Sequence, residues 1–127
     1  MLDFNKIKTI PIKQRKNKVK LSDLVKPENS KIMIDSKEFD ELIRKILVAH
    51  KNKKQIILMI GAHVIKIGMS LLLIDLMKKG IISHIAMNGA GPIHDFELAL
   101  IGETSEYVEE TIEDGTFGMI EETGRLL

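Results

Sequence analysis

Cysteine and tryptophan are absent from this sequence of 127 residues. Without cysteine the chain has no disulfide, no thiol nucleophile and no thiolate ligand for a metal ion. The absence of cysteine also fits a reducing compartment, so we expect a cytoplasmic protein. Aromatic residues make up only 4% of the chain, which argues against a stacking surface for single-stranded nucleic acid.

Long apolar runs are also absent, so we expect no membrane-spanning helix and no membrane partner. The first twelve residues alternate lysine with isoleucine and include Pro11, unlike the apolar core of a signal peptide. The hydrophobic fraction of 44% and the charged fraction of 29% are typical of a soluble folded protein, and the length is that of one domain.

Charge is unevenly distributed although the net charge is only +1. Residues 1–20 contain seven basic side chains and one acid, whereas ten acids and one base follow from Asp95 onward. A basic arm of this kind can bind nucleic acid or an acidic partner. Alternatively, it packs on the acidic end of its own or a neighbouring chain. We favour packing on protein over nucleic acid, because no aromatic residue other than Phe4 lies among the lysines.

The hydrophobic pattern divides the chain into residues 1–35, a basic N-terminal arm and connector, and residues 36–127, a folded domain. The connector includes a short extended piece at Lys31–Ile34. Apolar residues at helical spacing predict a helix over residues 36–50. Short apolar runs at Gln55–Ile60 and Ile81–Met87 predict two buried parallel strands. Further helices are predicted over Val64–Lys79, Ile93–Ile101, Ser105–Glu113 and Phe117–Leu127.

The order of strand, helix, strand and helix predicts a right-handed βαβ unit. The expected fold class is α/β, a Rossmann-like parallel sheet with helices on both faces. Only two or three strands are visible, fewer than such a sheet normally uses. The last residues, Gly124–Leu127, stop inside a predicted helix. We therefore expect the sheet to be incomplete in this chain and the sequence to be part of a larger domain.

The first strand ends in a turn, Gly61-Ala62-His63, which opens a helix that includes Gly68. Ligands of parallel sheets bind at the carboxyl ends of the strands, where backbone N–H groups and helix N-termini attract phosphate. The spacing is not that of the G-x-G-x-x-G dinucleotide motif. An ordinary strand-to-helix turn without a ligand remains the alternative.

The second strand ends in a glycine-rich turn, Asn88-Gly89-Ala90-Gly91, and the next helix begins with His94 and Asp95 near its start. Glycines let a backbone approach a ligand closely. His94 is a candidate acid or base, and Asp95 a candidate partner of a ribose or substrate. Alternatively, Asp95 caps the helix and His94 is a surface residue. The two turns are expected at one edge of the sheet, which favours a shared nucleotide site.

A metal site is not expected. The histidines His63, His84 and His94 do not have the spacing of two ligands on one strand or one helix face, and cysteine is absent.

The stretch Ile57–Leu100 resembles the deoxyhypusine synthase family, including its bacterial deoxyhypusine synthase-like branch. In that family an apolar strand leads to Thr-Ser-Asn, then Ser-Ser-Gly, a helix, a second strand, and Thr-Ala-Gly-Gly followed by Glu-Glu-Asp. When the family's Ser-Ser-Gly glycine is placed on Gly68, the second turn falls on Asn88–Gly91 and the final acid on Asp95. The segments Ile101–Ser105 and Gly115–Met119 are similar to the bacterial branch.

The resemblance implies a Rossmann-like fold, bound NAD and a homotetramer with active sites at subunit interfaces. It also implies an enzyme that oxidises spermidine with NAD and transfers an aminobutyl group to a lysine through an imine. The expected partners are therefore a polyamine or related small amine and further copies of the chain. The residues at the family's NAD-binding positions are Gly61, Ala62, His63, Gly68, Asn88, Gly89, Ala90, Gly91 and Asp95.

The chain departs from the family at several of these positions. The Thr-Ser-Asn turn falls on Gly61–His63, the Ser-Ser pair on Lys66-Ile67, and the two Glu positions on Ile93 and His94. Losing two carboxylates removes anionic partners for a cationic polyamine, so the pocket could favour another substrate. The family's catalytic lysine falls beyond Leu127, so we expect an N-terminal fragment. The alternative function is a non-catalytic nucleotide-binding or protein-interaction module of the same fold.

Overall fold

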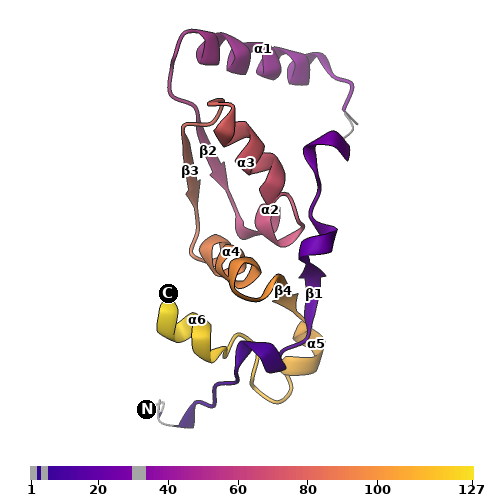
Figure 1. The fold of residues 1–127 in the computed structure, drawn as a ribbon, viewed down its shortest axis with the longest axis vertical. Coiled ribbons are helices and arrows are strands. Elements are labelled where there is room, and N and C mark those ends of the chain that lie inside the picture. The colour runs from indigo at the N-terminus through magenta and orange to yellow at the C-terminus, as the bar shows by residue number, and fades with distance from the viewer. Residues whose placement is uncertain (1–2, 4–5, 30–33) are drawn as a thin grey trace.

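A computed structural model describes residue 3, residues 6–29 and residues 34–127. Residues 31–33 of the expected extended piece lie outside the described residues. Helices and two small sheets together form a mixed α/β fold (Figure 1). The central elements are α1 (Lys37–Lys51), β2 (Ile57–Ile60), α2 (Ala62–Lys66), α3 (Ser70–Lys78), β3 (His84–Met87) and α4 (Ala90–Ile101). The elements near the two ends are short 3-10 turns at Ile12–Gln14, Leu21–Asp23 and Pro27–Asn29, with β1 (Asn17–Lys20), β4 (Glu103–Glu106), α5 (Val108–Thr111) and α6 (Glu121–Leu126).

Strands β2 and β3 pair in parallel, from Ile57 opposite His84 to Ile60 opposite Met87. The chain crosses between them through α2 and α3, so the predicted strand–helix–strand unit is confirmed. On one face, side chains of both strands pack against the core residues Ile65, Leu73 and Leu98. On the other face, Ile57 is 62% exposed and Met59 is 79% exposed. The described residues therefore cover one face of this strand pair.

The predicted helix over Val64–Lys79 is wrong as a single element, because the chain breaks it into α2 and α3. The break lies at Gly68, whose φ of +87° is a left-handed conformation that favours glycine. A Cβ atom on Gly68 would lie 2.9 Å from the carbonyl oxygen of Asp23. The amide of Val25 also donates to the carbonyl of Gly68 at 2.9 Å. Close packing of the connector thus explains this glycine.

The predicted helix over Ser105–Glu113 is also wrong at its start, because residues 103–106 form strand β4. This strand pairs antiparallel with β1, with Val19 opposite Thr104 and Asn17 opposite Glu106. The helix that follows, α5, is only four residues long. The last helix, α6, begins later than predicted, at Glu121. The N-terminal segment is therefore part of the folded structure around α4.

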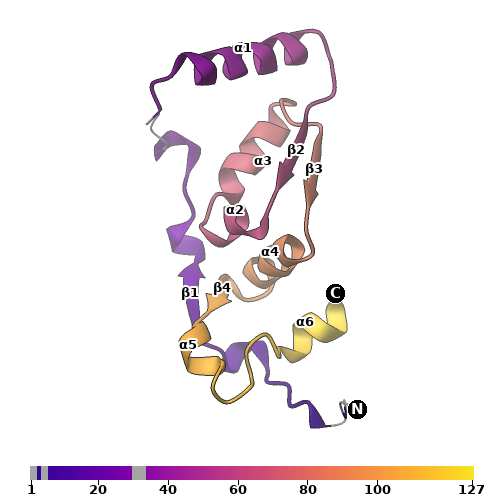
Figure 2. The same ribbon diagram turned by 180° about the vertical axis from the view of Figure 1, so that it is seen from behind.

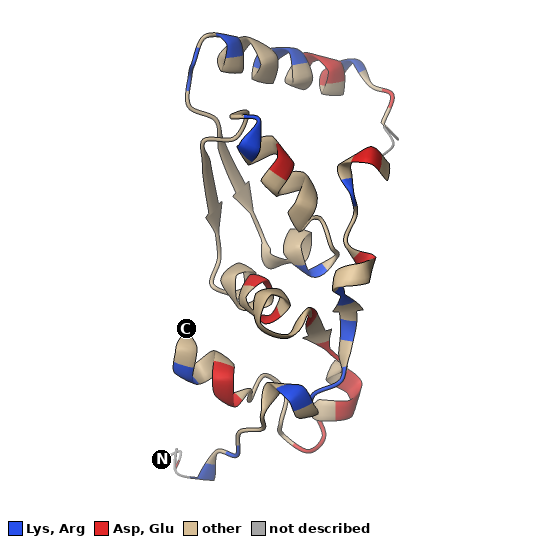
Figure 3. Ribbon diagram, viewed as in Figure 1, with Lys and Arg blue, Asp and Glu red and all other residues tan. Residues whose placement is uncertain are grey.

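The basic N-terminal segment packs on the acidic end of its own chain. The ammonium of Lys16 lies 2.9 Å from a carboxylate oxygen of Glu110, and that of Lys18 lies 3.2 Å from Glu109. Figure 3 shows the basic β1 beside the acidic α5. These contacts agree with the second of the two interpretations of the charge pattern, in which the basic arm packs on the acidic end of a protein chain.

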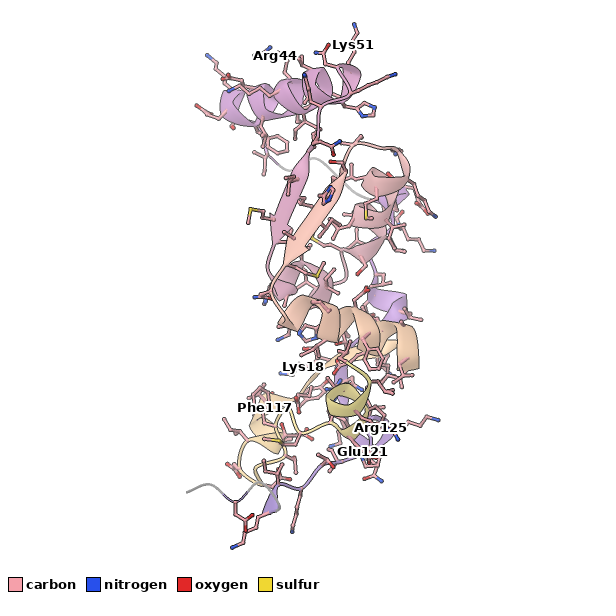
Figure 4. All side chains as sticks on the ribbon, turned by 90° about the vertical axis from the view of Figure 1, so that its left-hand side faces the viewer. Lys18, Arg44, Lys51, Phe117, Glu121 and Arg125 are labelled. Atoms are coloured by element: carbon pink, nitrogen blue, oxygen red, sulfur yellow. The ribbon has the colours of Figure 1, made fainter. Side chains whose placement is uncertain are left out.

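Helix α1 confirms the predicted helix over residues 36–50 within one residue at each end. The hydroxyl of Ser36 accepts a hydrogen bond from the amide of Phe39 at 3.1 Å and caps the helix. The helix lies beyond the end of the β2–β3 pair and apart from the other elements in views from front, back and side (Figures 1, 2 and 4). Its apolar residues Leu42 and Leu47 are exposed. Among the described residues, no helix is both long enough and apolar enough to cross a bilayer.

Candidate functional site

The two predicted turns meet at one edge of the β2–β3 pair. Because the strands are parallel and in register, Gly61 after β2 and Asn88 after β3 leave the sheet at the same end. An open surface depression of about 310 Å³ lies there. Its lining residues are Met59, Ile60, Ala86, Met87 and Asn88. The structure therefore brings together the two turns that the sequence predicts as a shared site.

At two positions in these turns, Gly61 and Gly89, neither the backbone conformation nor the packing requires glycine. Gly61 has a φ of −88° and Gly89 a φ of −57°, values that any residue adopts. A Cβ atom added to either glycine would meet no atom within 4 Å in the described part of the chain. The missing side chains leave the backbone open to a close approach by a ligand at both turns.

The other predicted positions divide into packed and exposed residues. A Cβ atom on the buried Gly91 would lie 2.5 Å from the sulfur of Met87, so packing alone explains that glycine. His63, Ala90 and Asp95 are exposed, and Ala62 is half-buried. The predicted alternative that Asp95 caps the helix is wrong, because α4 begins five residues earlier and its cap position is Gly89.

His94 is held by a chain of hydrogen bonds. Its Nδ1 lies 2.7 Å from Oγ1 of Thr104 in β4, and that hydroxyl lies 2.5 Å from Oε2 of Glu97. A carboxylate can only accept, so the Thr104 hydroxyl donates to Glu97 and accepts the Nδ1–H of His94. This assignment leaves the lone pair of the neutral imidazole on Nε2. The alternative of His94 as a surface residue is wrong, because its side chain is only 19% exposed.

Glu97 is in turn fixed by Arg15, which precedes β1. The two terminal nitrogens of Arg15 each lie 2.8 Å from one carboxylate oxygen of Glu97. Nε of Arg15 also donates to the side-chain oxygen of Asn17 at 2.8 Å. The Arg15 and Glu97 side chains are 4% and 2% exposed. The hydrogen bond from Nη1 and the charge contact of Nη2 together fix the carboxylate orientation and therefore the position of the Thr104 hydroxyl.

Burial lowers the pKa of His94 below its ordinary value of 6.5. Removing the ring from water disfavours the charged imidazolium, and this is the largest effect. Glu97 opposes the change, whereas the positive charges of Lys66, Arg15 and His63 add to it. His94 is therefore predominantly neutral at pH 7, and Nε2 can accept a proton.

The ring of His94 lines a cavity of about 200 Å³ between α4, β4 and the segment around α6. Lys66 of α2 and the hydroxyl residues Ser105 and Thr123 also line it, and Phe117 contributes to its apolar wall. Figure 4 shows Phe117 in the part of the chain that leads to α6. This volume suits a small molecule rather than a dinucleotide.

Ser105 adds a strained residue to this cavity. It is 3% exposed and has a φ of +66°, in the left-handed region that non-glycine residues rarely adopt. Such conformations cost about 1–3 kcal/mol and cluster at functional sites. Ser105 directly follows Thr104, so the strained backbone lies beside the hydrogen-bonded chain that holds His94.

Sequence reasoning found His94 but not the residues that position it. Glu97 follows His94 by three residues on one helix, a spacing that places two side chains on the same face. This spacing could have identified Glu97 from the sequence. Arg15 and Thr104 reach the site through the pairing of β1 with β4, and no local pattern indicated that pairing. Within the described residues, no group of three His, Cys, Asp or Glu side chains could hold a metal ion.

Comparisons with known proteins identify no relative of the chain. No family model, no curated protein and no solved structure matches the chain. The resemblance to the deoxyhypusine synthase family therefore stays a prediction based on the residues quoted for it.

Proposed function

We propose that the chain belongs to an NAD-dependent transferase, similar to deoxyhypusine synthase, that acts on a polyamine-type or related small amine. The supporting observation is the placement of α4. This helix begins at the edge where the turns after β2 and β3 meet, and one turn later it positions His94 on the cavity of about 200 Å³. A nucleotide at the turns and a small substrate in the cavity would then lie on either side of the start of one helix.

The glycines at the turns fit a bound nucleotide. Gly61 and Gly89 leave open space at both strand ends, where parallel sheets bind such groups. When bound, NAD supplies a hydride acceptor for oxidation of the carbon next to the amine nitrogen. Asp95, exposed on α4, is the candidate partner of a ribose hydroxyl or of the substrate.

His94 is the proposed proton acceptor. Its Nε2 takes the proton that the amine nitrogen loses when the neighbouring C–N bond becomes an imine. The imidazolium that forms donates through Nδ1 to Thr104, whose hydroxyl donates to Glu97. The negative charge of Glu97 thus acts on the ring through one hydroxyl, and Arg15 keeps the carboxylate in place.

The second candidate is a non-catalytic module that assembles with a protein partner or with further copies of the chain. The uncovered face of β2–β3, with Ile57 and Met59, favours it. Parallel strands are normally covered on both faces, so an exposed face of this kind is typical of an interface.

Calorimetric titration of the chain with NAD tests the proposal. We expect NAD to bind, and the Gly89→Leu variant to bind at least tenfold more weakly, because the added side chain occupies the open space at the turn. Gly124→Leu is the matched control, because that glycine also has open space around it but lies in α6. Absence of NAD binding would overturn the proposal. Binding of NAD without formation of NADH in the presence of spermidine or of a small amino acid such as 4-aminobutyrate would favour the non-catalytic module.

A further inference from the structure

The cavity beside His94 contains hydrogen-bond donors that lack acceptors. Lys66 is one of the lining residues, and within the described residues its side chain has no ion pair or hydrogen bond. The hydroxyl Oγ1 of Thr123 is buried and also has no hydrogen-bond partner there. Leaving a buried donor such as the Thr123 hydroxyl without an acceptor is unfavourable, and Lys66 is a half-buried cation without an anionic partner, so these two groups favour a ligand that accepts hydrogen bonds.

The acceptors of the cavity are largely used by the protein itself. Of the two carboxylate oxygens of Glu106, Oε1 accepts the amide of Gly118 at 3.0 Å and Oε2 accepts the hydroxyl of Thr111 at 3.2 Å. Both oxygens of Glu97 are bound by Arg15, and one of them also by Thr104. Nε2 of His94 is a further acceptor that a ligand can use. A polyamine, which offers only donors, would leave Lys66 and the Thr123 hydroxyl without an acceptor.

Part of the cavity wall is apolar. Ile93, Val108 and Phe117 line the same cavity, and they suit a short hydrocarbon chain. The volume of about 200 Å³ restricts the ligand to a small molecule. A carboxylate for Lys66, a hydrocarbon body for the apolar wall and an amine nitrogen for Nε2 would together match the groups of the cavity.

We infer that the small amine substrate also has a carboxylate, which pairs with Lys66 and accepts the Thr123 hydroxyl. This inference rests on the proposed function, because it names the second charged group of the substrate at the same site. In the deoxyhypusine synthase family, the position of Lys66 is a serine. A lysine at this position adds a positive charge, which favours a substrate with an anionic group over a polyamine.

The test is a titration of the full chain by NMR with three probes of similar length: butyrate, butylamine and 4-aminobutyrate. We expect butyrate and 4-aminobutyrate to bind at least tenfold more tightly than butylamine. Lys66→Met should weaken butyrate binding about tenfold or more, because it removes the ammonium but keeps the length of the side chain. Thr123→Val, which keeps the shape of the side chain, should weaken it severalfold. Lys51→Met is the control on the distant α1 (Figure 4) and should leave butyrate binding unchanged.

Butylamine binding as tight as that of butyrate would overturn the inference. Unchanged butyrate affinity in folded Lys66→Met would do the same. Thr123→Val gives an independent answer if Lys66→Met does not fold. A parallel NAD titration separates the two proposals. Binding of butyrate through Lys66 without NAD binding supports the carboxylate site and contradicts only the NAD proposal, whereas NAD binding without preference for butyrate contradicts only the carboxylate site.

Discussion

The guanidinium of Arg15 contacts both carboxylate oxygens of Glu97 although 82 residues separate the two positions. Both side chains are buried, so each charge depends on the other for compensation. Replacing one partner of such a pair leaves an unpaired buried charge, which is more costly than the loss of the contact itself. The pair also connects the segment before β1 to α4 beside the candidate site.

Arg15→Met should therefore lower the free energy of unfolding by about 3–5 kcal/mol, measured by urea denaturation. The matched control is Lys16→Met. Lys16 is exposed and pairs with Glu110 on the surface, where ion pairs contribute little, so its loss should hardly change the urea midpoint. Equal midpoints for the two variants would show that the buried pair does not stabilise the fold.

Adding Glu97→Gln to Arg15→Met should restore part of the lost stability. The neutral amide no longer leaves a buried charge, and its oxygen can still accept the Thr104 hydroxyl. Thermal unfolding of the single and double variants measures this recovery. A double variant less stable than Arg15→Met would instead indicate that Glu97 stabilises the fold independently of Arg15.

The stability of the protein should depend on the protonation of His94. Its pKa is lowered in the folded chain, so the unfolded chain binds this proton more readily. The free energy that neutral His94 contributes to stability is fully present above about pH 6.5, the pKa of histidine in the unfolded chain. It is lost as the pH falls from there through the lower pKa of the folded chain. The slope from one proton is at most about 1.4 kcal/mol per pH unit.

Urea denaturation between pH 7.5 and about pH 5 measures this effect. In His94→Gln the difference between neutral and acid pH should be smaller than in the unchanged chain. His84→Gln is the control, because His84 is exposed on the uncovered face of β3. If His84→Gln reduced the pH dependence as much as His94→Gln, burial of His94 would not be its cause.

Local patterns predicted the centre of the chain well. Helix α1 and strands β2 and β3 have their own signals, namely apolar residues at helical spacing and short apolar runs, and the end of α4 at Ile101 was predicted as well. The edge where the turns at Gly61 and Asn88 meet follows from the parallel pairing. These features depend on residues that are near in sequence, which is why the sequence indicates them.

The errors lie where distant segments decide the structure. Residues 104–106 look like the start of a helix, yet pairing with β1 makes them a strand. The break at Gly68 depends on the connector near Asp23, which packs against it. The surroundings of His94 also depend on distant segments, because the pairing of β1 with β4 brings Arg15 and Thr104 to it. Long-range contacts of this kind have no local periodicity, so sequence reasoning missed the part of the site that orients the histidine.

Two glycines of the second turn, Gly89 and Gly91, should lose different amounts of stability when they are replaced by alanine. Alanine normally stabilises a helix by up to about 1 kcal/mol relative to glycine. Gly91→Ala should nevertheless lower the melting temperature, because its Cβ would lie 2.5 Å from the sulfur of Met87. Gly89→Ala should lower it less, because its Cβ meets no described atom within 4 Å and only the preference of the helix cap for glycine over alanine is lost.

Thermal unfolding followed by circular dichroism distinguishes the two variants. The double variant Gly91→Ala with Met87→Ala is the control, since removing the long side chain of Met87 also removes the clash. Its melting temperature should be compared with that of Met87→Ala alone, and the added alanine should then cause no further loss. A further loss of similar size would mean that Met87 is not the reason for glycine at this position.

Ser105 should be more stable as glycine. Its φ of +66° disfavours every residue with a Cβ atom by about 1–2 kcal/mol, and glycine removes that strain. The greater freedom of glycine in the unfolded chain offsets part of the gain. Ser105→Gly should therefore raise the free energy of unfolding by up to about 1 kcal/mol, measured by urea denaturation. Ser105→Ala separates the backbone effect from the loss of the hydroxyl, because alanine lacks the hydroxyl but keeps the strain.

The strain also predicts the opposite result for a β-branched side chain. Ser105→Val should destabilise the chain by more than Ser105→Ala, because branching at Cβ makes the left-handed conformation less favourable still. If glycine, alanine and valine gave equal stabilities at position 105, the positive φ would store no energy. If glycine stabilises the fold but weakens butyrate binding at the adjacent cavity, the strained serine is retained for its hydroxyl and its position on the cavity wall, since stability alone would favour its replacement.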